Sequence, residues 1–266
     1  MNLRFLGVLA AIIVASIIYI GVSDSIKSHS SGVTLNSATG ASPAPASVVS
    51  DINSVPGSTF DTIGKGSVNS LPASIKASAL TENQKPEVFY EGAEFCPYCA
   101  TERWAMAVAL ARFGTFSNLK ITKSSSTDVY PNTNSLSFYK STYTSKYVTF
   151  TPLELYTNIP SGGGYTTLQT PTAKEQALTS KYDSSGGIPF IDLGGKYLVN
   201  NATYSPQTIT GKSWSQIASS LAKPNNTIAK GVDGAANALT AAICKLTNNQ
   251  PGNVCDTTIQ SIERQF

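Results

Sequence analysis

Glu87-Val88-Phe89-Tyr90-Glu91-Gly92-Ala93-Glu94-Phe95-Cys96-Pro97-Tyr98-Cys99-Ala100 is the most informative stretch of this sequence. It opens with a β-branched and aromatic run of the kind that a buried strand carries. Two cysteines separated by Pro97 and Tyr98 follow, and residues 100–113 are rich in Ala, Met, Leu and Val. Proline suits the first turn of a helix, and Gly114 suits its end. The stretch predicts a strand that leads into a helix, with a Cys-x-x-Cys pair at the junction.

The position of this pair suggests its chemistry. Cys96 would sit at the helix N-terminus, where unpaired backbone N–H groups and the helix dipole stabilise a thiolate. A thiol with a pKa of about 8.5 is only slightly ionised at neutral pH, whereas a pKa of about 6 makes it mostly thiolate. We therefore expect Cys96 to be a nucleophile. Cys99, one helical turn later, would resolve the mixed disulfide.

A structural disulfide and a metal site are the alternatives for this pair. A disulfide that closes so short a loop removes little chain entropy. A zinc site needs further Cys or His ligands, and the only histidine is His29, near the N-terminus. The sequence therefore favours redox activity, and we expect no metal and no bound cofactor.

Cys244 and Cys255 form a second pair, separated by the turn-forming residues 247–252. A disulfide that closes a ring of about 12 residues could contribute up to about 3 kcal/mol in the chain-entropy model. We predict a structural disulfide. A second redox pair that relays electrons to the first stays open as an alternative.

The composition limits the classes of function. The 266 residues leave room for one domain of roughly 150–200 residues plus extensions. The net charge is only +3 and the 19 Lys and Arg are scattered, so nothing suggests a nucleic-acid partner. Four cysteines in two close pairs are typical of a compartment where disulfides persist. Two glycosylation sequons, at Asn201 and Asn225, are compatible with an exported surface.

The N-terminal segment predicts the location. Residues 5–22 are apolar and uncharged, with Arg4 before them, and their number is near the lower limit for spanning a bilayer. We expect residues 1–22 to be one transmembrane anchor, with the domain outside the cytoplasm by the positive-inside rule. A cleaved signal peptide, which would leave a secreted protein, is the alternative.

The rest of the chain predicts an α/β fold. Residues 23–50 are rich in Ser, Pro and Ala and are expected to be a flexible tether, and residues 51–266 the domain. Phe60 and Ile63 are spaced for one helical face, which Gly64 would end. After the cysteine-bearing helix we predict a strand at 119–122 and a hairpin insertion at about 125–170, with alternating runs at 136–143 and 146–155. A helix from residue 172 and a hairpin of 189–193 with 196–199 follow. The last predicted elements are helices at 213–221 and 227–246, the second with Asn226 as its N-cap.

Residues 93–99 resemble the active-site segment of the thioredoxin superfamily, and the Pro-Tyr dipeptide is similar to that of glutaredoxins. Ile188-Pro189 resembles the superfamily's cis-proline loop, which lies against the cysteine pair. The resemblance implies a thioredoxin-like three-layer fold with a β-hairpin insertion and C-terminal helices. It also implies a nucleophilic Cys96, a resolving Cys99, and substrate contacts from Pro97, Tyr98, Ile188 and Pro189.

A narrower resemblance comes from residues 92–105 and 126–133. These segments are similar to a family of archaeal and bacterial membrane-anchored proteins catalogued as a domain of unknown function. The similarity covers roughly residues 50–266. It implies a fold and a location but no substrate.

One position departs from the thioredoxin pattern. Thioredoxins have a buried aspartate that relays protons six residues before the first cysteine, and Tyr90 stands there in this chain. Glu91, Glu94 and Glu102 are the candidates for a moved relay, although each could equally be a solvated surface carboxylate. Glu102 is the strongest, because it lies three residues after Cys99 on the same helical face. For Arg103 we expect a surface ion pair.

These features predict an extracytoplasmic thiol–disulfide oxidoreductase that forms or isomerises disulfides in exported, cysteine-containing proteins. An oxidising compartment and the proline beside Cys96 favour this direction. A membrane redox partner, such as a quinone-linked protein, would recharge the pair. The alternative is a non-catalytic cell-surface protein that binds partners through its Tyr- and Thr-rich region, residues 135–157.

Overall fold

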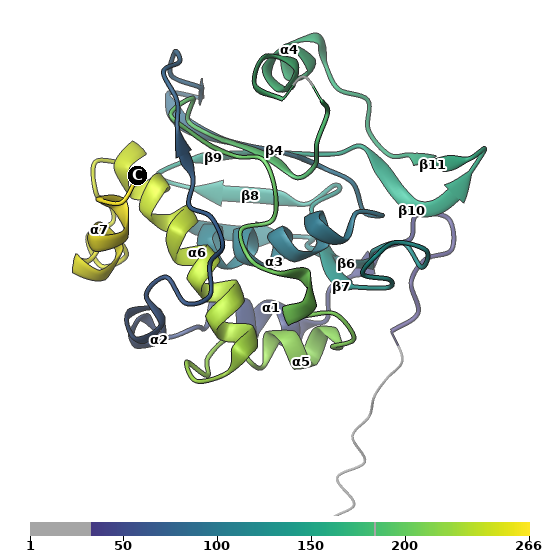
Figure 1. Ribbon diagram of the computed structural model, residues 1–266, viewed down its shortest axis with the longest axis horizontal. Coiled ribbons are helices and arrows are strands. Elements are labelled where there is room, and N and C mark those ends of the chain that lie inside the picture. Colours follow the sequence, from purple (N-terminus) through teal and green to yellow (C-terminus); the bar gives the residue numbers. More distant parts are fainter. Residues whose placement is uncertain (1–32, 184) are drawn as a thin grey trace, which may run out of the picture. The chain divides into compact units, whose positions relative to one another are not determined.

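The predicted strand and helix lie at the centre of the fold. The computed structural model describes residues 33–183 and 185–266, in which β4 spans Lys85–Gly92 and α3 spans Pro97–Ala111 (Figure 1). Cys96 is the N-cap of α3, and Pro97 occupies its first turn as predicted. Gly114 does not end this helix, because the last turn closes at Arg112 and Gly114 already begins strand β5.

The main sheet is built around β4. It has β9 (Thr149–Glu154) as a parallel neighbour on one side and β12 (Phe190–Leu193) as an antiparallel neighbour on the other. The sheet continues from β12 to β13 (Tyr197–Val199) and then β2 (Ala73–Ser74), and the short β3 (Thr81–Glu82) pairs with the start of β4. Because β4 is paired on both sides and covered on both faces, its hydrophobic run is continuous rather than alternating.

Helices cover both faces of this sheet (Figure 1). Tyr90 and Ile191 face the larger core, which contains the buried sides of α3 and of α6 (Thr227–Leu246). Phe89 and Phe190 face a smaller cluster that includes residues of α4 (Ala173–Tyr182). The described chain is therefore a mixed α/β fold of helix, sheet and helix layers, with the cysteine-bearing helix in the larger core.

The region after α3 differs from the predicted hairpins. The strands there are β5 (Gly114–Ser117), β6 (Lys120–Lys123), β7 (Asn134–Ser137) and β8 (Thr142–Ser145). The runs at 136–143 and 146–155 do not pair with each other: β7 pairs with β6, β8 pairs with β5, and β9 joins the main sheet. The prediction of one insertion over 125–170 is thus wrong for β9, whose alternating pattern reflects a strand beside β4. Strands β10 (Tyr156–Ser161) and β11 (Gly164–Thr167) form a separate hairpin.

The predicted tether is wrong for its last part. Strand β1 (Ser42–Pro43) pairs with β6, and α1 (Ala46–Asn53) buries Val48 and Ile52 in the larger core. The apolar residues at this three- to four-residue spacing outweigh the Ser- and Pro-rich composition. Helix α2 (Gly57–Ile63) follows and ends at Gly64, as predicted.

The C-terminal part agrees with most of the expectations. The β12–β13 hairpin turns at Gly194-Gly195, and Asn226 caps α6 by accepting a hydrogen bond from the Ile228 N–H. A short 3-10 helix (Pro206–Thr208) and α5 (Trp214–Ala218) precede α6. The predicted disulfide between Cys244 and Cys255 is present, and it joins α6 to the segment before α7 (Thr257–Glu263), a helix that the sequence did not predict.

Two predictions concern the exported location. The proposed anchor at residues 5–22 lies outside the described residues, and within the described ranges no helix is both long and apolar enough to cross a membrane. Asn201 and Asn225 are both exposed, so glycosylation at these sequons stays a prediction.

Removal of the Cys244–Cys255 disulfide tests its structural role. We expect the double variant Cys244→Ala/Cys255→Ala to fold but to lose up to about 3 kcal/mol of unfolding free energy, because the unfolded chain is no longer constrained. Denaturant unfolding monitored by circular dichroism measures this loss. An unchanged midpoint would contradict the structural role.

Candidate redox site

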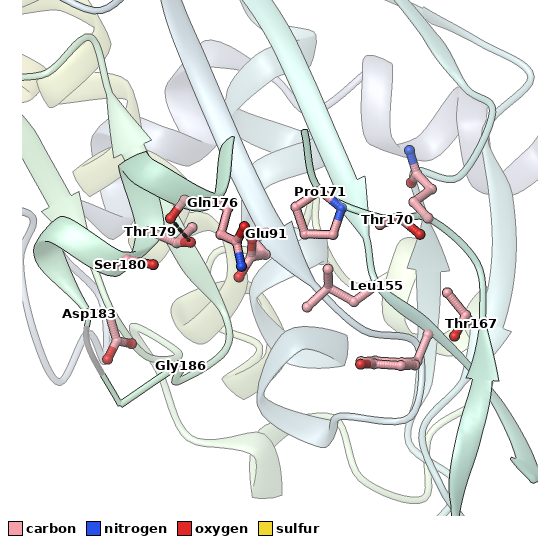
Figure 2. A pocket seen from close by; sticks show the side chains of 12 residues that line it. Glu91, Leu155, Thr167, Thr170, Pro171, Gln176, Thr179, Ser180, Asp183 and Gly186 are labelled. Carbon is pink, nitrogen blue, oxygen red and sulfur yellow. Dashed lines mark hydrogen bonds between the residues drawn. The ribbon is translucent and has the colours of Figure 1, made fainter. Parts of the chain in front are cut away.

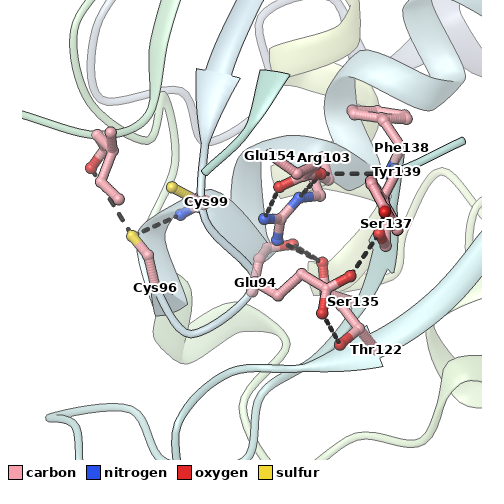
Figure 3. A network of polar contacts seen from close by, with 12 residues as sticks. Glu94, Cys96, Cys99, Arg103, Thr122, Ser135, Ser137, Phe138, Tyr139 and Glu154 are labelled. Carbon is pink, nitrogen blue, oxygen red and sulfur yellow. Dashed lines mark hydrogen bonds and ion pairs between the residues drawn. The ribbon is translucent and has the colours of Figure 1, made fainter. Parts of the chain in front are cut away.

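Cys96 and Cys99 lie at the N-terminal end of α3 (Figure 3), and they differ in their access to solvent. The Cys96 side chain is 5% exposed and Cys99 is fully buried. The backbone N–H of Cys99 donates to Cys96 Sγ at 3.2 Å, and the Cys96 thiol points at the carbonyl oxygen of Ile188 at 3.7 Å. Both thiols are free. Cys96 is therefore the cysteine that an incoming sulfur can reach first.

The surroundings separate the two thiols electrostatically. A hydrogen bond from the Cys99 thiol lowers the pKa of Cys96, and the Cys99 N–H and the positive charge of Arg103 act in the same direction against the effect of burial. Burial raises the pKa of Cys99 well above its usual value. In the reduced pair a thiolate is thus favoured on Cys96 over Cys99.

The Ile188–Pro189 loop lies against this pair, between α4 and β12. The peptide bond is cis, as the sequence resemblance implied, and the Ile188 carbonyl contacts Cys96. Ile188 is partly exposed. The loop therefore brings a backbone segment beside the sulfur at which exchange would occur.

Arg103 forms a buried ion pair, not the surface pair that we predicted. Two of its three guanidinium nitrogens donate to Glu154 at the end of β9, Nε to Oε1 at 2.8 Å and Nη2 to Oε2 at 2.6 Å (Figure 3). Glu154 Oε1 also accepts from the Phe138 N–H at 3.1 Å, and Arg103 Nη1 lies 3.4 Å from Ser135 Oγ. Both side chains are fully buried, so each depends on the other for its charged state.

Glu94 is also buried, so the alternative of a solvated carboxylate is wrong for it. Its carboxylate accepts from Ser137 Oγ at 2.6 Å and from Thr122 Oγ1 at 3.4 Å. Burial, helped by the negative charge of Glu154, raises its pKa to about 7. It contacts strands β6 and β7 two residues before Cys96.

Glu102, the leading relay candidate, binds another loop. Its carboxylate accepts hydrogen bonds from the Thr203 N–H at 2.8 Å and the Thr203 hydroxyl at 2.9 Å. The side chain is fully buried, and burial raises its pKa to about 7. These contacts hold the segment after β13 against α3, which is a structural task. Among the hydrogen bonds of the described residues, none joins Glu102 to either cysteine.

Glu91 lies on the face of β4 opposite to Tyr90, in a pocket of about 410 Å³ (Figure 2). Burial raises its pKa to about 7, and Glu175 and Asp183 add to the shift. The pocket is walled by α4 and by residues after β9, including Leu155 and Tyr156, whose backbones bond to Gly92 and Glu94. The pocket thus adjoins the segment that leads into the cysteines.

Aromatic side chains surround the outer side of the pair. Tyr98, between the cysteines, makes an edge contact with Tyr130 at 5.9 Å between ring centroids. Phe95 stacks on Tyr165 at 4.2 Å between ring centroids, and its other aromatic neighbour, Tyr156, is 40% exposed. Tyr98 is therefore held in place by the loop of residues 126–133, which the sequence marked only as a family motif.

The sequence marked Tyr90 only as a departure from the thioredoxin pattern and Arg103 only as half of a surface ion pair, and it did not mark Glu154. Tyr90 is fully buried, with its ring 5.5 Å from that of Phe138 and its hydroxyl facing the cysteines' side of the sheet. Arg103 and Glu154 meet although 51 residues separate them. The only local signal was the position of Arg103, one turn after Cys99 on α3. Within residues 33–183 and 185–266, no group of three or more His, Cys, Asp or Glu side chains is placed to hold a metal ion.

The sequence comparisons identify a family. The model of the Domain of unknown function (DUF929) matches residues 72–245, well over half of the 266 residues. The chain belongs to this family. The DUF929 match contains β4, both cysteines of the pair, α3 and the Ile188–Pro189 loop. Neither the curated proteins nor the solved structures contain a match to this sequence.

The buried carboxylate of Glu102 predicts a pH-dependent stability. Its pKa is about 7 when folded, so between the unfolded value and pH 7 the folded protein binds more protons than the unfolded one, and stability falls as the pH rises. We expect Glu102→Gln to reduce the fall in unfolding free energy between about pH 5 and about pH 8 by on the order of 3 kcal/mol.

Denaturant titrations at several pH values measure this slope. The exposed Glu82→Gln is the matched control, and it should leave the slope unchanged. Equal slopes for Glu102→Gln and the wild type would show that the carboxylate is not protonated in the folded protein.

Proposed function

We propose that this DUF929 protein is a thiol–disulfide oxidoreductase of thioredoxin-like fold, with Cys96 and Cys99 as its redox pair. The carrying observation is the unequal pair at the helix N-terminus. Cys96 is the more accessible thiol and has a lowered pKa, while Cys99 is buried one turn behind it. Thiol exchange needs one sulfur that attacks or is attacked and a second that resolves.

The order of elements supports the thioredoxin-like part of the proposal. Strand β4 leads into the cysteine pair and α3, and β9 returns parallel to β4. After α4, the cis Ile188–Pro189 loop stands immediately before the β12–β13 hairpin and touches Cys96. These are the positions that the sequence resemblance implies for the active-site segment and the cis-proline loop.

The exchange balances with these two sulfurs alone. In the oxidising direction, a partner thiolate attacks Cys96 Sγ of the Cys96–Cys99 disulfide, the S–S bond breaks, and Cys99 leaves as a thiolate. A second thiolate of the partner then attacks the partner sulfur that is bonded to Cys96 in the mixed disulfide, and Cys96 leaves as a thiolate. The partner has lost two electrons and gained a disulfide, and the pair has been reduced. In isomerisation the reduced pair acts instead: the Cys96 thiolate attacks a partner disulfide and frees one partner thiolate, and another partner thiolate later attacks the mixed disulfide and releases Cys96, so no electrons are transferred overall.

The electrostatics favour the oxidising direction. The N–H of Cys99 and the Arg103 charge stabilise a Cys96 thiolate, which exists only in the reduced pair. Stabilisation of the reduced form makes the disulfide a stronger oxidant. The structure therefore supports disulfide formation or isomerisation as the proposed direction.

The partners follow from this chemistry. They would be exported polypeptides with cysteines, bound as extended segments over Tyr98 and the backbone of Ile188. The pocket beside Glu91 offers space for their flanking residues. The proposal retains a single-pass anchor at residues 5–22, a domain outside the cytoplasm, and a membrane redox partner that returns the pair to its disulfide.

Activity of the full-length protein tests this function. We expect the oxidised protein to introduce disulfides into a reduced, unfolded model protein, and Cys96→Ser to abolish the reaction, because the attacked sulfur is gone. When Cys99→Ala is mixed with the same model protein in a disulfide-bonded form, the Cys96 thiolate should attack that disulfide and accumulate as a mixed disulfide, visible by mass spectrometry, because no Cys99 is present to resolve it. The double variant Cys244→Ala/Cys255→Ala is the control that should keep the activity.

Two results would count against the proposal. If Cys96→Ser exchanged thiols as well as the wild type, the pair would not be the redox centre, and a binding function would remain. If the potential of the pair, measured in glutathione buffers, lay near about −270 mV, the oxidising direction would be wrong.

A further inference from the structure

The hydroxyl of Tyr90 has no hydrogen-bond partner among the described residues, although it is completely buried. A buried hydroxyl without a partner costs on the order of 1–3 kcal/mol. The ring itself packs as a phenylalanine would, edge-on to Phe138. The fold therefore needs the ring of Tyr90 but leaves its oxygen unexplained.

This oxygen lies beside Cys99. Tyr90 and Gly92 point to the same face of β4, because side chains alternate along a strand. A Cβ atom added at Gly92 would lie 3.2 Å from Cys99 Sγ and even closer to Tyr90 Oη. Both atoms therefore border the space that a side chain at position 92 would fill.

Arg103 brings a positive charge to the same place. It follows Cys99 by one helical turn, and its Cζ lies 5.8 Å from the ring centroid of Tyr90. The carboxylate of Glu154 accepts two hydrogen bonds from the guanidinium and holds it in place (Figure 3). A charge held this way keeps its position when the redox state of the cysteines changes.

We propose that Tyr90 and Arg103 form a thiolate site for Cys99, in which the Tyr90 hydroxyl donates a hydrogen bond to the ionised Sγ and Arg103 supplies the balancing charge. This inference rests on the proposed redox function. The partner of the unpaired hydroxyl is then the Cys99 thiolate, which exists only during exchange. Otherwise the buried sulfur of Cys99 is a neutral thiol or is bonded to Cys96.

The need for such a site follows from the burial of Cys99. In the oxidising direction Cys99 must leave as a thiolate, and in the resolving direction it must become one before it attacks Cys96, its proton ending on the departing partner sulfur. The charged and titratable groups around it are Tyr90 on β4, Cys96 and Arg103 at α3, and Glu154 on β9. Burial raises the pKa of Tyr90 well above its usual value, so the phenol keeps the proton that it would donate to a thiolate.

The direct test measures the pKa of Cys99 when it is the sole free thiol. In full-length Cys96→Ala protein, we expect Tyr90→Phe to raise the Cys99 pKa by about one unit or more, because a hydrogen bond to an ionised group is lost. The pH dependence of thiolate absorbance and of alkylation reports this pKa. Tyr143→Phe is the matched control, since its hydroxyl donates to the Leu110 carbonyl in the same aromatic cluster.

The kinetic test uses the intact pair. Tyr90→Phe should slow the resolution of a preformed mixed disulfide on Cys96 at least about tenfold, with Tyr143→Phe near the wild-type rate. The double variant Arg103→Met/Glu154→Gln, which removes both charges and leaves none buried alone, should raise the Cys99 pKa as well. Circular dichroism confirms that each variant is folded.

The outcomes separate the two proposals. Unchanged Cys99 pKa values in Tyr90→Phe and in the double variant would overturn the thiolate site, whatever the activity. If the wild type exchanged no thiols, the oxidoreductase function would fail, while the titration of Cys99 would still decide whether Tyr90 and Arg103 stabilise its thiolate.

Discussion

The buried ion pair between Arg103 and Glu154 is the interaction on which this molecule depends most. It fastens the cysteine-bearing helix to the end of β9 and, through the Phe138 N–H and Ser135, to the strand β7. Neither charge reaches solvent, so removing one partner would leave the other buried and unpaired, which would lower the free energy of unfolding by about 3–5 kcal/mol. The same guanidinium stands beside both thiols. Structural rigidity and the electrostatics of the pair therefore come from one contact.

The parts that could be predicted are those determined by neighbouring residues. The strand-to-helix junction at Cys96, the cap at Asn226, the turn at Gly194-Gly195 and the Cys244–Cys255 disulfide all follow from a few consecutive residues. The predictions of the tether and of the hairpins failed because these segments pair with strands that are distant in the sequence. A polar segment such as β1 becomes a strand only because β6, far along the chain, offers it an edge, and β9 alternates in the same way whether it pairs locally or with β4.

The site divides along the same line. The location of Cys96 and Cys99 at the start of α3 was predictable, because the strand pattern, Pro97 and the spacing of the two cysteines determine it. The burial of the carboxylates was not, since their partners are remote: Glu102 binds Thr203, 101 residues away, and Glu94 binds Ser137, 43 residues away. With so few charged residues, the chain places several of them in its interior, where each needs specific donors. The substitution of tyrosine at position 90 signalled altered proton handling, but only the geometry around Gly92 suggests how.

The bond between Thr203 and Glu102 also bears on biosynthesis. Thr203 is the third residue of the sequon that begins at Asn201, and in the folded protein it is wholly enclosed. An enzyme that reads this triplet must therefore act on the nascent chain, before the loop closes on α3. The second sequon ends at the exposed Thr227 and is free of this restriction. If both sequons are glycosylated, occupancy at the first would thus depend on how quickly the loop folds, whereas occupancy at the second would not.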